Sequence, residues 1–256
     1  MQICLRLRKW LVAFAVAAFT LPLVASGVAH SDDSFPSDKA SLDAYIRDYI
    51  LKNPTVVRQA LLELQQEEDS NRAKEVLRGL SKDIYGSSSP EIGEPAAKVT
   101  IVEFYDYNCP YCRASYSRVK AFIKAHPDTK LLLKDTASFG KESEAVARIA
   151  LAANIQGKFP QLHDALMSEK GTMTEERALG IAKGLGFDIG QLKKDAQSSK
   201  IGEALTQTQT LANKLNVTTT PLFIIGHNGI VGVPDDFDKE LASYVEDVRK
   251  AGCDAC

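Results

Sequence analysis

Two pairs of cysteines in this chain have the spacing Cys-x-x-Cys. Cys109 and Cys112 form one pair, and Cys253 and Cys256 form the other. Such a pair can open and close a disulfide, because one thiolate attacks a partner sulfur and the second thiol resolves the mixed disulfide. Two pairs can also bind zinc, but these pairs are about 140 residues apart, far more than in a usual tetrathiolate site. The spacing favours redox chemistry and leaves a structural disulfide and a zinc site as alternatives.

The residues around the first pair predict which thiol is the nucleophile. A β-forming run from Val99 to Tyr105 leads to Cys109, and a helical pattern follows. Cys109 would then lie at a helix N-terminus, where unpaired N–H groups and the helix dipole favour a thiolate. Pro110 suits the helix start because its missing N–H is not needed there. We therefore predict Cys109 as the nucleophile and Cys112, one turn later, as the more buried resolving thiol.

Glu103 is the one acidic residue in the middle of this apolar run, six residues before Cys109. Burying an ionised carboxylate is costly, so its presence there indicates a function. A glutamate at the solvent-exposed edge of the sheet is the alternative.

The N-terminus has the pattern of a secretory signal peptide over residues 1–29. Arg6, Arg8 and Lys9 precede an apolar run from Trp10 to Val24, and small residues follow. An uncleaved membrane anchor is the alternative. We expect the leader, which contains Cys4, to be cleaved on export, so the remaining cysteines meet an oxidising compartment.

The composition is that of a globular protein without a nucleic-acid partner. The chain has 256 residues, of which 45% are hydrophobic and 25% charged, with a net charge of −2. No overall basic field attracts nucleic acid. No histidine has a metal-binding spacing, so we expect no metal and predict ordinary surface positions for all four, which are His30, His126, His163 and His227.

Residues 38–86 have a helical pattern with exposed apolar positions. We predict one helix from Asp38 and a second, longer helix that carries its apolar stripe as far as Ile84, with Asn53 as the N-cap and Pro54 at the first helical position. The stripe needs a partner surface, and packing on the chain's own domain and self-association are both open. Gly86 to Pro90 has the composition of a linker.

The rest of the chain alternates strands and helices, which predicts an α/β fold. We expect parallel strands at 99–105 and 130–134, an amphipathic helix at 236–250, and a turn at His227–Gly229 between two late strands. The predicted late strands are 222–225 and 230–233, and the predicted helices between the strands are 143–155, 159–167, 174–185 and 189–215.

Two segments of this region resemble a known family. Val102 to Arg113 resembles the active-site segment of the DsbA-like branch of the thioredoxin superfamily, and Thr218 to Phe223 is similar to its threonine–cis-proline loop. The resemblance extends from about Ile92 to Arg249. It implies a thioredoxin fold with an inserted helical subdomain at about 137–207, and no cofactor. It also implies site roles: Glu103 as a buried acid that moves the proton of the resolving thiol, and Pro110, Tyr111, Thr220 and Pro221 as substrate contacts.

Residues 49–61 are similar to the N-terminal extension of oligomeric DsbA-like proteins, including the ScsC group. The resemblance implies a homo-oligomer through residues 38–86, with a dimer favoured and a trimer possible, and isomerase activity like that of the DsbC and DsbG proteins. It implies a periplasmic location, unfolded or misoxidised secreted proteins as substrates, and a membrane redox partner, either a DsbB-like oxidase or a DsbD-like reductase. A plain DsbA-type oxidase, and a non-catalytic chaperone or metal-binding module, are the alternatives.

These observations divide the chain into a signal peptide at 1–29, a helical oligomerisation segment and linker at 30–90, a DsbA-like domain at 91–252, and a Cys-x-x-Cys tail at 253–256. The tail lies outside the family's catalytic elements, and we expect a terminal disulfide there, with a redox relay or a metal tether as alternatives. After the second strand, Lys134 to Gly140 departs from the family pattern, which has a proline soon after the lysine. The substrate surface there is expected to differ.

Overall fold

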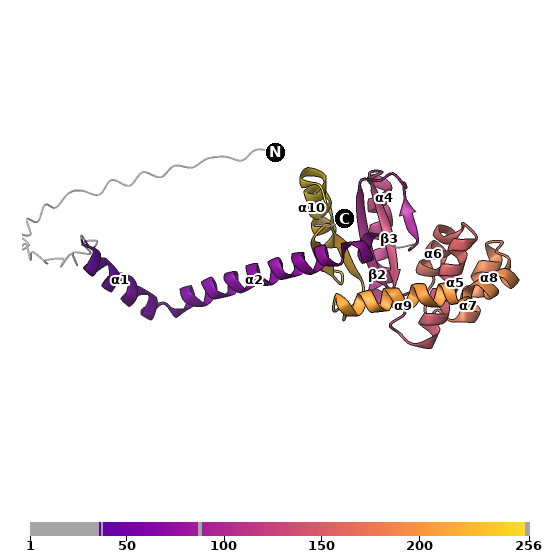
Figure 1. Cartoon of the computed structure of the whole chain (residues 1–256), viewed down its shortest axis with the longest axis horizontal. Coiled ribbons are helices and arrows are strands. Elements are labelled where there is room, and N and C mark those ends of the chain that lie inside the picture. The colour runs from indigo at the N-terminus through magenta and orange to yellow at the C-terminus, as the bar shows by residue number, and fades with distance from the viewer. Residues whose placement is uncertain (1–35, 37, 87–88, 254–256) are drawn as a thin grey trace, which may run out of the picture. The chain divides into compact units, whose positions relative to one another are not determined.

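The computed structural model describes residue 36, residues 38–86 and residues 89–253 (Figure 1). The predicted signal peptide at 1–29, with Cys4 and His30, lies outside the described residues. The chain divides after Gln59 into two compact units, which are described separately below. No helix among the described residues is both long and apolar enough to cross a membrane.

The first unit contains α1 (Lys39–Lys52) and the first turns of α2 (Pro54–Gly79). Asp38 caps α1 by accepting the Ser41 N–H at 3.0 Å. Asn53 stands directly before Pro54, the first residue of α2, as predicted, and its side-chain amide donates to the Tyr49 carbonyl at 2.8 Å, which closes the end of α1. No residue of α1 is buried.

Four large side chains on one side of α1 are exposed in the single chain. They share the helical spacing i, i+1, i+4 and i+5, and we call them the N-terminal apolar face: Tyr45, Ile46, Tyr49 and Ile50.

The second predicted helix is two helices. α2 ends at Gly79, and a short helix α3 follows at Ser81–Tyr85. Glycine favours a helix end, because it loses more backbone freedom in a helix than other residues do. Because the helix breaks after Gly79, Leu77 before the break and Ile84 after it both pack into one apolar cluster against the sheet.

Five strands form one sheet in the order β1-β3-β2-β4-β5. The central pair, β2 (Val99–Tyr105) and β3 (Thr129–Asp135), is parallel as predicted, and the other pairs are antiparallel. β1 (Glu91–Gly93) was not predicted, because three residues give no alternation. β4 (Leu222–Ile225) has the predicted bounds, whereas β5 (Asn228–Val231) begins two residues early because Gly226, with φ +61°, makes the turn.

Helices cover both faces of the sheet (Figure 1). On one face, α4 (Pro110–Ala125) and α10 (Phe237–Ala251) contribute to the main apolar core. On the other face, Leu211 and Ala212 of α9 (Ser199–Lys214) pack with Val102, Phe104 and Ile224 of the strands. Side chains of β2 therefore point alternately into two cores. Glu103 and Tyr105 lie on the face of the sheet that α4 covers.

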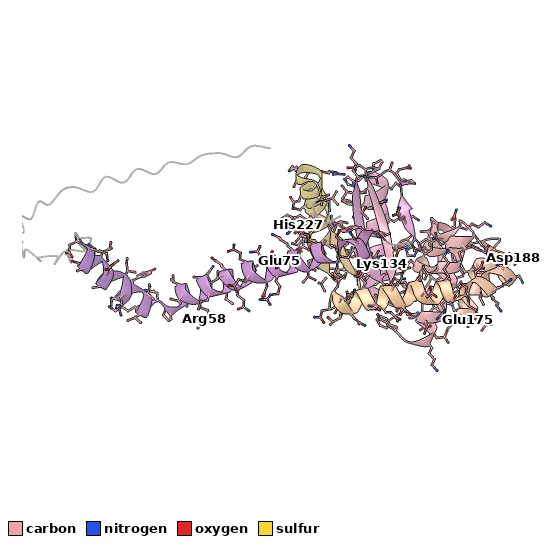
Figure 2. All side chains as sticks on the ribbon, viewed as in Figure 1. Arg58, Glu75, Lys134, Glu175, Asp188 and His227 are labelled. Carbon is pink, nitrogen blue, oxygen red and sulfur yellow. The ribbon has the colours of Figure 1, made fainter. Side chains whose placement is uncertain are left out.

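Helices lie between β3 and β4 as predicted, but the last of them continues to Lys214, past the predicted end of the insert at about 207. They are α5 (Lys141–Ile155), α6 (Phe159–Ser168), α7 (Glu175–Gly184), α8 (Ile189–Ala196) and α9. The prediction of one helix over 189–215 is wrong, because Ser198 caps a new helix by accepting the Ile201 N–H. Figure 2 shows Glu175 and Asp188 in this helical part of the molecule, where Asp188 caps α8.

Candidate active site

Cys109 is the N-cap residue of α4. Its Sγ accepts the N–H of Cys112 at 3.4 Å, and its own N–H donates to the Asp106 carbonyl at 3.1 Å. Pro110 follows at the first helical position, as predicted. Cys109 and Cys112 are both free thiols with almost no exposed surface, whereas Pro110 and Tyr111 are exposed and flank them.

The two thiols have opposite acidities. Hydrogen bonds from the Cys112 thiol and from main-chain N–H groups at the helix start lower the pKa of Cys109 to about 6. Burial, together with the Cys109 sulfur and the charge of Glu103, raises the pKa of Cys112 far above its usual range. The site therefore holds one thiolate at neutral pH and one thiol that loses its proton only with help.

The Thr220–Pro221 loop lies against the nucleophile. The Cys109 Sγ is 3.3 Å from the Thr220 carbonyl oxygen, and the Thr220–Pro221 peptide bond is cis. A hydrogen bond from Thr220 also lowers the pKa of Cys109. The loop precedes β4, which pairs with β2, so the central strands position both the thiols and this loop.

Glu103 is fully buried. β2 is paired on both sides, with Leu133 and Phe223 opposite Glu103, so the alternative of an exposed edge position is wrong. Neither carboxyl oxygen has a hydrogen-bond partner among the described residues. Burial, and to a smaller extent the charge of Cys109, raises the pKa of Glu103 to about 8. A carboxyl with this pKa can accept and return a proton near neutral pH.

Sequence reasoning missed the side chains that fix the active-site loop. The carboxylate of Asp106 accepts hydrogen bonds from the Asn108 N–H, the Phe139 N–H and the Ser143 hydroxyl. The Asn108 side chain pairs with the backbone of Met173 in both directions, at 2.7 and 3.0 Å. The only available signal was the run Asp106-Tyr107-Asn108, whose first and last residues are common turn formers.

Arg113 extends this contact between the active-site loop and the helical insert. Its Nε donates to the Tyr107 carbonyl at 2.6 Å, and its Nη1 donates to the carbonyls of Glu169 and Gly171. Together with Asn108, it joins the loop to residues 169–173.

The prediction that His163 lies on the surface is wrong. The ring is fully buried among the aromatic rings of Tyr105, Tyr107, Tyr116 and Phe159. Its Nδ1 is 2.8 Å from the Tyr107 hydroxyl, and the Tyr105 hydroxyl donates to that of Tyr107 at 3.2 Å. Burial lowers the pKa of His163 to about 3, so the imidazole is neutral. His126 and His227 are partly exposed.

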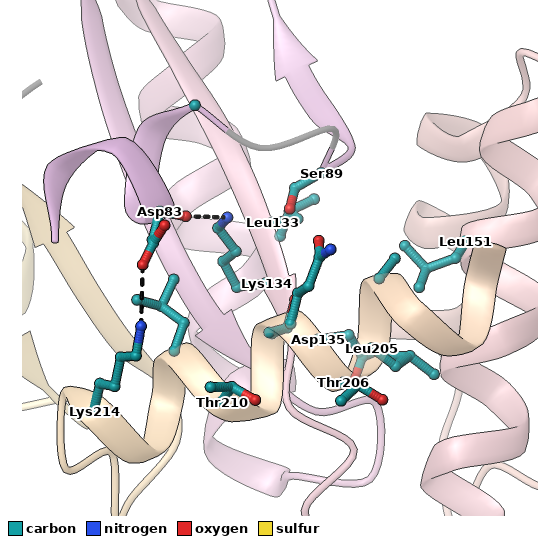
Figure 3. A pocket seen from close by; sticks show the side chains of 15 residues that line it. Asp83, Ser89, Leu133, Lys134, Asp135, Leu151, Leu205, Thr206, Thr210 and Lys214 are labelled. Atoms are coloured by element: carbon teal, nitrogen blue, oxygen red, sulfur yellow. Dashed lines mark hydrogen bonds and ion pairs between the residues drawn. The ribbon is translucent and has the colours of Figure 1, made fainter. Parts of the chain in front are cut away.

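The segment that departs from the family pattern begins with two buried charged residues, Lys134 and Asp135. Lys134 lines a cavity of about 450 Å³ between β3 and α9, and its ammonium donates to the Asp83 carbonyl at 3.2 Å (Figure 3). In the same cavity wall, the Asp83 carboxylate pairs with Lys214 at 3.4 Å. Burial lowers the pKa of Lys134 to about 8.

Within residues 38–86 and 89–253, no three His, Cys, Asp or Glu side chains form a metal-binding group. Cys253 is disulfide-bonded, and Cys256 lies outside the described residues, so the pairing within the tail stays a prediction.

Three features of the structure define a thiol–disulfide oxidoreductase of the thioredoxin fold. They are a sheet whose two central strands are parallel, a Cys-x-x-Cys motif at the start of a helix, and an adjacent cis-proline loop. The chain belongs to the thioredoxin family, whose model, described as "Thioredoxin", matches residues 87–247. A second model, "Copper resistance protein ScsC N-terminal domain", matches residues 38–69. The chain is thus a DsbA-like member of the ScsC type, as the sequence resemblance implied.

Solved structures agree with this assignment. A thioredoxin-like oxidoreductase from Silicibacter pomeroyi DSS-3 is 34% identical, with a TM-score of 0.63, over 67% of this chain and 98% of that one. The catalytic domain of Proteus mirabilis ScsC is 25% identical, with a TM-score of 0.61, over 68% of this chain and 97% of that one.

Curated relatives are of two kinds. A probable disulfide bond formation protein D from Bacillus anthracis is 29% identical over 177 residues, which are 64% of this chain and 80% of that protein. A Na⁺/H⁺ antiporter NhaA 1 from Salinispora arenicola is 26% identical over 145 residues, which are 54% of this chain but only 22% of the antiporter. The chain therefore spans under a quarter of that antiporter.

Proposed function

We propose that this protein is a periplasmic thiol–disulfide oxidoreductase that acts on secreted proteins during folding. The observation that carries the proposal is the opposite acidity of Cys109 and Cys112 beside the Thr220–Pro221 loop. An ionised nucleophile next to a protonated resolving thiol is the arrangement that thiol–disulfide exchange requires.

The proposed reaction transfers two electrons between the cysteine pair and a substrate disulfide. The Cys109 thiolate attacks one substrate sulfur, the S–S bond of the substrate breaks, and the other substrate sulfur leaves as a thiolate. Cys112 then gives its proton to the Glu103 carboxylate and attacks the Cys109 sulfur, which releases the reduced substrate and closes the Cys109–Cys112 disulfide. The reverse sequence oxidises a dithiol substrate. Pro110 and Tyr111, which are exposed, and the backbone of the Thr220–Pro221 loop, whose side chains are buried, would contact the substrate chain around the reacting sulfur.

The N-terminal apolar face supports a proposal of self-association. Four large side chains are between 39% and 54% exposed in the single chain, which is unfavourable in water unless another surface covers them. The match to an ScsC N-terminal domain over residues 38–69 favours a second copy of this chain as the partner. We propose a homodimer, with a trimer as the other closed assembly. Placing several cysteine pairs in one assembly favours isomerase over oxidase activity.

The redox state of Cys109 and Cys112 in intact cells distinguishes an isomerase from a disulfide-donating oxidase. Cells are acid-quenched and alkylated with a maleimide, and the mass of the protein is measured. A mainly reduced pair supports an isomerase kept reduced by a DsbD-like reductase. A mainly oxidised pair supports a disulfide donor recharged by a DsbB-like oxidase.

A matched pair of variants tests the role of the apolar face. Tyr49→Ser with Ile50→Ser removes apolar area that is already exposed, so the single chain should stay folded. We expect a monomer by light scattering, loss of isomerase activity on scrambled ribonuclease, and an unchanged rate of insulin reduction. Asp43→Ser, at an exposed charged position of the same helix, is the control. An assembly that survives the double substitution would exclude the proposed interface.

A further inference from the structure

A groove of about 900 Å³ opens beside the nucleophile and is not used in the steps above. Asn108 and Pro110, which flank Cys109 in sequence, both line it. The rest of its wall comes from the first two turns of α4, from the end of α6 with the loop after it (residues 167–172), and from the segment after β3, which includes Phe139. Because Pro110 is also one of the proposed substrate contacts, the groove is continuous with the active-site surface.

Hydrogen bonds of the active-site loop hold the walls of this groove at fixed positions relative to Cys109. The carboxylate of Asp106 accepts both the Asn108 N–H and the Phe139 N–H, at 2.7 and 3.1 Å. It therefore joins the residue before the nucleophile to the segment after β3. On the other side, the Asn108 side chain pairs with the main chain of Met173, directly after the loop. A pocket fixed relative to a nucleophile can select the side chain that lies next to the reacting sulfur.

The charged groups around the groove mostly interact within the protein. The Arg113 guanidinium donates to main-chain carbonyls of the loop after α6. Glu169 pairs with Arg177 at 3.1 Å, and Glu142 accepts a main-chain N–H of α7 at 3.1 Å. Lys170 is exposed, so its charge is solvated. Attraction to a ligand therefore comes mainly from apolar area and not from an ion pair.

The apolar part of the groove combines buried side chains with one exposed ring. Tyr116 and Met167 are 5% and 3% exposed, whereas Phe139 is 55% exposed. Ligand sites are typically concave surfaces lined by apolar and aromatic side chains, and a volume of about 900 Å³ is within their usual range. Phe139 lies in the segment from Lys134 to Gly140 that departs from the family pattern, so this wall is a feature of this chain.

We propose that this groove binds one bulky apolar side chain of the substrate, close in sequence to the cysteine that Cys109 attacks, and that Phe139 determines the preference. The inference rests on the proposed function, in which Cys109 attacks a disulfide of a secreted protein that is still folding. A substrate chain that reaches Cys109 passes Pro110 and brings a neighbouring side chain to the groove. Folded proteins bury their large apolar side chains, whereas unfolded chains expose them, so the groove favours unfolded substrates.

The experiment measures the second-order rate at which the reduced protein attacks peptide disulfides. Three peptides of glycine and serine carry one cysteine as its mixed disulfide with thionitrobenzoate, with phenylalanine before the cysteine, after it, or absent. Cys109 attacks the cysteine sulfur, the S–S bond breaks, and thionitrobenzoate leaves as a coloured thiolate; Cys112 then displaces the peptide as a thiol. We expect at least one phenylalanine peptide to react roughly tenfold faster than the peptide without phenylalanine, at the low end of what an apolar pocket provides.

Variants of the groove are compared by this ratio of rates, so that the peptide without phenylalanine is the reference for each protein. Phe139→Ser should reduce the ratio to about twofold or less, and Phe139→Leu should keep most of it. Ala114→Trp fills the groove from α4 and should also abolish the preference. Ile155→Ser, at an apolar position of similar exposure (53%) outside the groove, is the control and should keep the full ratio.

Three results would overturn the inference. Equal rates with the three peptides, or a ratio that survives in Phe139→Ser, would mean that the groove does not bind a substrate side chain. Loss of the ratio in Tyr111→Ser and not in Phe139→Ser would place the apolar contact elsewhere. A changed oligomeric state of Phe139→Ser in light scattering would mean that a second copy of the chain covers the groove.

The proposed function is tested separately by the peptide without phenylalanine. If the unsubstituted protein reacts with this peptide faster than Cys109→Ser does, thiol–disulfide exchange at Cys109 stands whatever the groove binds. If the two proteins react equally slowly, the proposed function itself fails.

Discussion

Replacing Glu103 by glutamine should stabilise the protein relative to the unsubstituted one by an amount that increases as pH rises. Glu103 has a pKa of about 8 in the folded protein, against 4.5 for an ordinary glutamate, mainly because it is buried. Between these values the folded state binds more protons than the unfolded state, so the free energy of unfolding falls with increasing pH. The stability that protonation of Glu103 gives to the folded state is fully present below pH 4.5 and is lost as pH rises through about 8. At pH 7 the two and a half units above 4.5 correspond to roughly 3 kcal/mol.

The measurement is urea unfolding of the reduced protein and of Glu103→Gln between pH 5 and 8. The difference between the two proteins isolates Glu103, because Cys109 titrates in both. That difference should grow in favour of glutamine by about 1 kcal/mol for each pH unit in the middle of the range. Glu91→Gln, at an exposed strand position where the carboxylate pairs with Lys130, is the control for removing a carboxyl that is not buried. If the difference does not vary with pH, the carboxyl is solvated in solution and the assigned pKa is wrong.

Three further predictions concern the loop and the thiols. In the reduced protein, the rate of Cys109 alkylation by iodoacetamide should be half-maximal near pH 6, with Cys112 unmodified, as mapped by peptide mass, and equal labelling rates would contradict the opposite acidities. Thr220→Val removes a hydrogen bond to the thiolate, so the pKa of Cys109 should rise, as followed by thiolate absorbance, and an unchanged titration would exclude that contact. Asn108→Ala breaks the link to Met173 and should lower the free energy of unfolding by about 1–3 kcal/mol in urea, whereas exposed Asn154→Ala should not, and equal effects would count against the link.

The parts of the fold that follow local rules could be predicted from the sequence. The bounds of β2 and β4 were correct because apolar β-forming runs end at clear turn or proline signals. The position of Cys109 at the start of α4 was correct because Pro110 marks a helix N-terminus. Glu103 could also be identified from the sequence, because an acidic residue inside an apolar β-forming run is unusual.

The parts that depend on tertiary packing could not be predicted. His163 shares the buried stripe of α6 with Phe159, Leu162 and Leu166, so helical spacing indicated a buried position, but the rings of β2 and α4 that it contacts there depend on packing. The hydrogen bond from the Asn53 side chain to the Tyr49 carbonyl, at the end of α1, was also not predicted, because the sequence pattern pointed only to the helix that follows. Asp135 stood in a segment that differed from the family pattern, but only the register with Tyr105 places it behind the active site.

The proposed mixed disulfide changes the acidity of Glu103 at the step that needs it. The thiolate of Cys109 contributes to the raised pKa of Glu103, and that charge disappears when Cys109 becomes part of a disulfide. The pKa of Glu103 should then fall while burial still keeps it above 4.5, so the carboxylate fraction at neutral pH increases. Cys112 must lose its proton at this moment, and a larger fraction of Glu103 is then in the carboxylate form that can accept it.

A stable mimic of the intermediate tests this coupling. Methyl methanethiosulfonate converts Cys109 in the Cys112→Ser variant into a methyl mixed disulfide, which cannot resolve. The carboxyl band of Glu103, identified by its loss in Glu103→Gln, should titrate at a lower pH in the mixed-disulfide form than in the free thiolate form. Titration at the same pH in both forms would mean that the charge of Cys109 does not reach Glu103. Proton transfer from Cys112 would then need a base whose acidity is independent of substrate attack.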